Sequence, residues 1–90
     1  MSYKALVTLD LPEATKEQRE IFYQVLKDEK WTKISNLDTA WKVTFKDGVT
    51  RIDAINTIKN DLEKAKLKSK LKRVDYAIQI DVNDVIIANL

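Results

Sequence analysis

Two segments near opposite ends of the chain place an apolar residue at every second position, and this period of two constrains the fold more than any other feature. In residues 3–11 one face carries Tyr3, Ala5, Val7, Leu9 and Leu11. In residues 73–82, the residues Val74, Tyr76, Ile78, Ile80 and Val82 alternate with Asp75, Ala77, Gln79 and Asp81. Successive side chains of a β-strand point to opposite faces, so both segments are predicted to be strands with one buried face. Leu6, on the second face, favours a central position for the first strand, and Pro12 ends it.

Two stretches between these strands have helical periodicity. Thr15 and Gln18 have the spacing of a capping box and open a helix over residues 16–30. Its apolar positions are Ile21, Phe22, Val25 and Leu26. Thr50, followed three residues later by Asp53, opens a second helix that is expected to run to about residue 67. The apolar stripe of this second helix is predicted to be Ile52, Ile55, Ile58, Leu62 and Ala65.

The segment between the helices is predicted to form a hairpin. Its strands are expected at about residues 31–37, with Trp31, Lys33 and Ile34, and at residues 41–46. Asn36, Leu37, Asp38 and Thr39 form the loop, because Asn and Asp support turns through local side-chain hydrogen bonds. Trp41, Val43 and Phe45 share one face, so the aromatic residues are expected in the core rather than on a base-stacking surface.

The order of elements is therefore strand–helix–strand–strand–helix–strand. Each helix has one apolar stripe, so both can cover the same face of a four-stranded antiparallel sheet. We predict an α+β, ferredoxin-like two-layer sandwich made of a single domain over residues 1–90, with the first and last strands in the centre of the sheet. The tail after residue 82 is predicted to be either one short helical turn, capped by Asn83 or Asp84, or an extra strand.

Composition excludes several classes of chemistry. The chain has no Cys and no His, so disulfides, thiolate metal sites and the commonest general base near neutral pH are ruled out. A single Gly rules out a glycine-rich phosphate loop. No apolar run approaches the roughly 20 residues that span a bilayer, and no targeting signal is recognisable, which predicts a cytoplasmic location.

A basic stretch runs from residue 64 to residue 73. Its cations are Lys64, Lys66, Lys68, Lys70, Lys72 and Arg73. With a net charge of +2 for the whole chain, this stretch carries +6 and the other residues carry −4. Such a stretch can bind a polyphosphate backbone in a salt-dependent way, although cations also stabilise a helix C-terminus and aid solubility. Alternate lysines at a helix end are expected to spread around its axis.

Asp10, at the end of the first strand, is the candidate for catalysis and for metal binding. In a symmetric dimer two copies of this carboxylate could meet at a divalent cation, but an Asp before Leu-Pro also serves as a turn residue. Asp75 and Asp81 share a polar face but lie roughly 20 Å apart along a strand, which is too far for one metal ion. Asp84 is explained by capping.

The strand ending in VTLDLP, the capped helix, the Trp-containing hairpin, the second helix and the last strand together resemble a known group. This order of elements resembles that of the small nucleases of CRISPR adaptation and, more closely, the GhoS-type antitoxin, an endoribonuclease with the same fold. In the CRISPR group an Asp that ends the first strand binds the metal across a dimer, and Asp10 is the matching position. The arginine-rich residues that follow that strand are represented here only by Lys16 and Arg19.

Two functional hypotheses follow. The first is a small homodimeric regulatory domain that contacts RNA or DNA, with the resemblance implying an endoribonuclease that would use Mg²⁺ or Mn²⁺. The second is a protein-interaction module whose interface is the apolar tail Val85, Ile86, Ile87 and Leu90, which could pair with an edge strand, dock in a groove or cap the domain's own core. A small-molecule enzyme is disfavoured, because no convergent carboxylates are visible.

Overall fold

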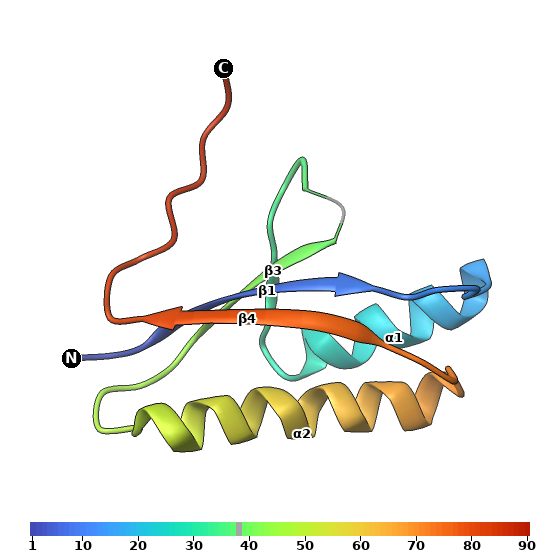
Figure 1. Cartoon of the computed structure of the whole chain (residues 1–90), viewed down its shortest axis with the longest axis horizontal. Helices are drawn as coiled ribbons and strands as arrows, with labels where there is room; N and C mark the ends of the chain where they lie inside the picture. Colours follow the sequence, from blue (N-terminus) through green and yellow to red (C-terminus); the bar gives the residue numbers. More distant parts are fainter. Residues whose placement is uncertain (38) are drawn as a thin grey trace.

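The computed structural model describes residues 1–37 and 39–90, so Asp38, expected in the hairpin loop, lies outside the described residues. The elements in chain order are β1 (Lys4–Asp10), α1 (Lys16–Asp28), β2 (Thr32–Lys33), β3 (Ala40–Thr44), α2 (Arg51–Ser69) and β4 (Asp75–Asp81). The four strands form one sheet in the order β2-β3-β1-β4, and every neighbouring pair is antiparallel. Figure 1 shows the helices on one side of this sheet. The predicted ferredoxin-like two-layer arrangement is confirmed.

The two terminal strands lie side by side, as predicted, but β4 is not central. β1 pairs with β4 along its whole length, from Lys4 opposite Asp81 to Asp10 opposite Asp75, and pairs with β3 on its other side. β4 therefore has one neighbour and forms an edge of the sheet, while β1 and β3 are central. The prediction of a central last strand was wrong because the hairpin enters on the far side of β1. The edge position also leaves Tyr76 45% exposed, although it was expected in the core.

The hairpin is shorter than its sequence pattern predicts. β2 contains only Thr32 and Lys33, whereas Trp31 and Ile34 on either side are buried without belonging to the strand. The Ile34 N–H still donates to the Ala40 carbonyl, and Asn36 turns the chain with a φ of 69°. Trp31 and Ile34 were predicted to be strand because of their apolar character, but they are buried on either side of a strand of two residues.

Both helices begin where the sequence predicts. Thr15 and Gln18 make both hydrogen bonds of a capping box, and the Thr50 hydroxyl accepts from the Asp53 backbone N–H. α1 buries Phe22, Val25 and Leu26 against the sheet and α2. Its last residue is Asp28, two residues earlier than expected, whereas α2 continues two residues longer, to Ser69.

The buried stripe of α2 differs in part from the predicted one. The buried residues are Ala54, Ile58, Leu62, Ala65 and Ser69. Ile52 was predicted to belong to this stripe but is 69% exposed, and Ile55 is only partly buried. An α-helix turns about 100° per residue, so Ile52 lies roughly 200° from Ala54, on the opposite side. The small side chain of Ala54, rather than the larger Ile52, faces the core.

In the described part of the chain neither helix covers the other side of the sheet, and we call that side the open face. The alternation and the strand register place on it Lys4, Leu6, Thr8 and Asp10 of β1, Lys42 and Thr44 of β3, and Asp75, Ala77, Gln79 and Asp81 of β4. Residues 82–90 leave the end of β4 on this side (Figure 1). They form neither the helical turn nor the strand that the sequence suggested, but an irregular segment.

Candidate nucleic-acid interface

Asp10 lies at the end of β1, directly opposite Asp75 of β4. The Arg73 Nε donates to the Asp75 Oδ1 at 2.9 Å, so a cation from the turn before β4 reaches this pair of carboxylates. The hydrogen bond to Asp75 and the negative charges of Asp75 and Asp10 raise the pKa of Arg73. Asp10 therefore sits in a small charged group at one end of the sheet, rather than alone at the rim.

The carboxylates of one chain do not assemble a metal site. Within residues 1–37 and 39–90, no group of three or more His, Cys, Asp or Glu side chains is placed to hold a metal ion. Of the two carboxylates at this end, Asp75 is already engaged by Arg73. A divalent cation centred on Asp10 would need further ligands from a second copy of the chain.

A cavity of about 360 Å³ opens beside Asp10. It is lined by Asp10, Leu11, Arg19, Tyr23, Lys33 and Thr39. These residues come from the end of β1, from α1, from β2 and from the loop before β3. The cavity thus brings two cations, one carboxylate and two hydroxyl-bearing side chains together from distant parts of the sequence.

The basic stretch is distributed over three kinds of position. Lys64 donates to the Glu29 Oε1 at 2.7 Å, and this bond raises the pKa of Lys64. Lys66 and Lys68 lie in the last turn of α2, where cations complement the helix dipole. Lys70 has a φ of 61° and ends the helix in the left-handed conformation.

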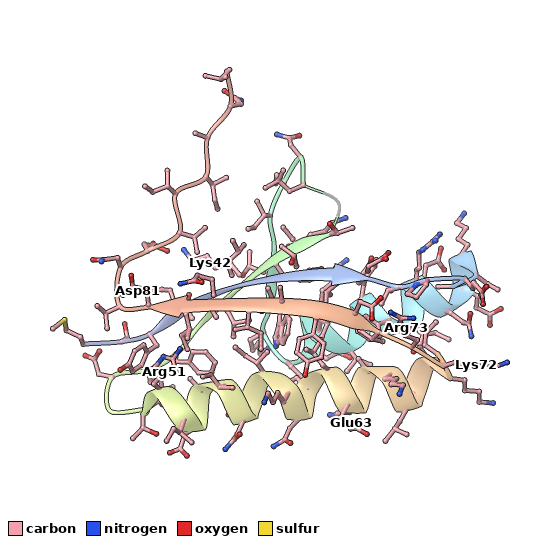
Figure 2. The ribbon with its side chains drawn as sticks, in the orientation of Figure 1. Lys42, Arg51, Glu63, Lys72, Arg73 and Asp81 are labelled. Carbon is pink, nitrogen blue, oxygen red and sulfur yellow. The ribbon has the colours of Figure 1, made fainter. Side chains whose placement is uncertain are left out.

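The end of the basic stretch lies close to the start of α1. Lys70 and Lys72 line a hollow with Pro12, Glu13 and Gln18, and the Gln18 Nε2 donates to the Lys70 carbonyl at 3.4 Å. Figure 2 shows Lys72 and Arg73 at one end of the molecule, where α2 leads into β4, and Asp81 at the opposite end. The last cations of the stretch therefore share one end of the molecule with Asp10.

The C-terminal tail is anchored at its base and exposed beyond it. Lys42 forms a salt bridge with Asp84, and the Lys4 Nζ donates to the Val82 carbonyl at 3.2 Å. The hydrogen bond from Lys42, together with the Val85 backbone N–H, lowers the pKa of Asp84. Beyond this anchor Ile86 is 93% exposed, and Ile87 and Leu90 are also exposed, so these three residues do not cap the core of their own domain.

Sequence reasoning identified Asp10 and the lysines but missed the residues around them. Lys33 and Thr39 have no motif, and Asp75 becomes a neighbour of Asp10 only through the antiparallel register of β1 and β4. That register is the one indication that the sequence could have provided. If the two alternating segments pair side by side and antiparallel along their whole length, residues 10 and 75 come together.

Comparison with known proteins supports the fold and goes no further. No protein-family model and no curated protein matches this chain. Among solved structures, the protein SP2199 from Streptococcus pneumoniae is similar, with a TM-score of 0.59 and 15% sequence identity over 94% of this chain and 90% of that chain. At this level of identity the likeness concerns the fold alone. In the part of the chain that the structure describes, neither helix has the length and apolar character needed to cross a bilayer.

Proposed function

We propose that this protein is a small regulatory domain that contacts RNA or DNA through the end of the molecule where α2 leads into β4. The observation that carries the proposal is that Lys70 and Lys72 lie beside the start of α1, while Arg73 approaches Asp10 and Asp75. Lys68, Lys70 and Lys72 are exposed, and in the described residues no carboxylate lies within 4 Å of their ammonium groups. Cations of this kind bind phosphates by releasing counterions.

A finer form of the proposal is an endoribonuclease of the antitoxin type. Asp10 would then be the catalytic carboxylate and a ligand to Mg²⁺ or Mn²⁺ shared between the two copies of a homodimer. What supports this is the place of Asp10 at the end of β1, beside a cavity whose lining includes the cationic side chains of Arg19 and Lys33. Because the described residues of one chain include no group of three metal-binding side chains, cleavage would depend on dimer formation as well as on metal.

The binding proposal is tested by titrating single- and double-stranded RNA and DNA at several salt concentrations, with and without Mg²⁺. The double variant Lys70→Gln/Lys72→Gln is expected to weaken binding and to flatten its dependence on salt. The matched control Lys27→Gln/Lys46→Gln removes the same charge from exposed lysines at the end of α1 and after β3. Equal effects of the two variants, or no salt-sensitive binding, would exclude this interface.

Cleavage that persists in Asp10→Ala would remove Asp10 from the mechanism and leave the binding proposal in place.

A second candidate function is a protein-interaction or homodimerisation module. It is favoured by the exposed apolar side chains of the tail, since Ile86, Ile87 and Leu90 lie on a segment without regular structure beyond an anchored base. An extended segment of this kind can add to a sheet edge or enter a groove. Mass measurement by size-exclusion chromatography with light scattering should show a dimer for the full chain and a monomer for Ile86→Asp/Leu90→Asp. A monomer in both cases would contradict this candidate.

A further inference from the structure

We propose that the cavity beside Asp10 binds one phosphodiester group of a nucleic acid, with Arg19 and Lys33 as the residues that hold it. This inference rests on the proposed function and names the chemical group that the cavity takes. It assigns a role to Lys33, Tyr23 and Thr39, which lie outside the basic stretch.

The two cations reach the cavity from different elements. Arg19 and Tyr23 are four residues apart in α1 and so lie on the same side of that helix. Lys33 approaches from β2, and its Nζ lies 5.9 Å from the centre of the Tyr23 ring. A guanidinium on one side and an ammonium on the other can contact different oxygens of one phosphate group, and the guanidinium can do so in a bidentate manner.

The walls of the cavity are held in place by the core. The Tyr23 ring packs against Trp41, which is fully buried, with 5.5 Å between ring centres, and it meets Phe22 edge-on at 6.0 Å. The Leu9 backbone N–H donates to the Thr39 carbonyl at 2.9 Å, which ties the loop before β3 to the end of β1. The cavity is therefore formed before any ligand arrives, so binding costs little ordering of the backbone.

The charge of the lining residues favours an anionic ligand. Arg19 and Lys33 contribute two positive charges and Asp10 one negative charge, which leaves +1. In residues 1–37 and 39–90, no carboxylate lies within 4 Å of either cationic group. A phosphodiester carries one negative charge and balances this excess. A terminal phosphate, with close to two charges at neutral pH, is attracted more strongly by Arg19 and Lys33 and repelled more strongly by Asp10, so charge alone does not separate the two kinds of phosphate.

The test is an NMR titration of the full chain with the dinucleotide UpU, which contains one phosphodiester and no terminal phosphate. Uridine monophosphate and inorganic phosphate are titrated in parallel. We expect saturable changes in the amide signals of Leu11, Arg19, Lys33 and Thr39 with UpU, and the titrations with the monoester and free phosphate measure how much of the binding a phosphate group alone provides. Arg19→Gln and Lys33→Gln should each weaken UpU binding by about tenfold, the loss expected for one charge-assisted hydrogen bond. Lys16→Gln and Lys27→Gln, on the same helix but outside the lining, should leave it unchanged.

The Asp10→Asn variant tests the charge argument separately. Removing the carboxylate should improve binding of uridine monophosphate more than that of UpU, because the repulsion by Asp10 grows with the charge of the ligand. An equal change for the two ligands would overturn the charge argument. The phosphodiester site would itself be overturned if UpU caused no saturable change at the cavity, or if Arg19→Gln and Lys33→Gln bound it as tightly as the wild type.

Failure of this inference can be distinguished from failure of the proposed function. If long RNA or DNA binds in a manner sensitive to Lys70→Gln/Lys72→Gln while UpU leaves the cavity unperturbed, the cavity proposal is wrong and the nucleic-acid interface stands. If UpU occupies the cavity but RNA and DNA of greater length fail to bind at every salt concentration, the proposed function is wrong. The test of the cavity requires Arg19→Gln and Lys33→Gln to retain the fold, which is expected because both side chains are exposed.

Discussion

The indole N–H of Trp31 donates to the Asp61 Oδ2 at 2.9 Å and so joins the segment before β2 to the middle of α2. Trp31 is buried and Asp61 is half-buried. Burial raises the pKa of Asp61, an effect that the Trp31 hydrogen bond and the Lys64 charge oppose and that the charge of Glu29 reinforces. The carboxylate is kept at this costly position because it accepts the hydrogen bond of a donor that would otherwise be buried without a partner.

Replacement of Asp61 by Leu should destabilise the protein by about 1–3 kcal/mol, because it leaves the buried Trp31 N–H without an acceptor. Asp61→Asn keeps a carbonyl acceptor and should cost less. Urea unfolding at neutral pH, followed by tryptophan fluorescence, measures both differences. Glu63→Leu, an exposed neighbour on α2, is the control and should change the free energy of unfolding by no more than about 0.5 kcal/mol. Equal costs for Asp61→Leu and Glu63→Leu would show that the hydrogen bond contributes nothing.

The same carboxyl group should give the protein a specific dependence on pH. Its pKa is raised in the folded state above the ordinary value of about 3.9, so between the two values the folded protein binds more protons than the unfolded chain. The contribution of Asp61 to stability therefore increases as the pH falls through the raised pKa, and it becomes constant below about 3.9. The free energy of unfolding of wild type minus that of Asp61→Asn should rise as the pH is lowered from 7 to about 4. A flat or falling difference would contradict a raised pKa.

The orientation of α2 can be tested by comparing two isoleucines that differ in exposure. Ile58 is fully buried and Ile52 is 69% exposed. Ile58→Ala should cost about 2–5 kcal/mol, because it leaves a cavity in the core, whereas Ile52→Ala should stay within about 0.5 kcal/mol. Chemical denaturation of the two variants measures the contrast, and similar losses would mean that α2 presents a different side to the sheet.

The parts of the fold that depend on local chemistry could be predicted from the sequence. The alternation in residues 3–11 and 73–82 and the two Thr caps identified two strands and two helix starts correctly. Tertiary packing determines the rest: the length of β2, the side of α2 that is buried and the edge position of β4. Ile52 illustrates the reason, since apolar character shows that a residue can be buried, but only the contact with the sheet selects Ala54 instead.

The candidate site divides in the same way. Asp10 and the lysines of the basic stretch could be named because each is conspicuous within a short window of sequence. Arg19, Lys33 and Thr39 are separated by loops whose geometry the sequence does not determine, and each is an ordinary surface residue in its own element. Lys33 lies in a β2 of only two residues, whereas the sequence pattern had extended this strand through residue 37.

The salt bridge between Lys42 and Asp84 anchors the tail, and its effect on the pKa of Asp84 can be distinguished from the effect of a more distant positive charge. Lys42 and the Val85 backbone N–H both favour the ionised form of Asp84 and lower its pKa. A carboxyl group with a lowered pKa stabilises the folded arrangement above its ordinary pKa of about 3.9, and this contribution is lost as the pH falls through the lowered value. Lys42→Gln removes the larger cause, so the pKa of Asp84 should move up towards the ordinary value, as measured by NMR titration of its carboxyl carbon.

Lys46→Gln is the control for this measurement, because it removes the same charge from an exposed position just after β3 that has no contact with Asp84. It should shift the pKa of Asp84 far less than Lys42→Gln does, since exposed charges are screened by solvent and salt. The Val85 amide, which donates to the Asp84 Oδ1 at 2.8 Å, should exchange with solvent faster in Lys42→Gln, because the base of the tail then loses its tie to β3. Equal pKa shifts in the two variants, with unchanged exchange at Val85, would show that the base of the tail is held in place without help from this salt bridge.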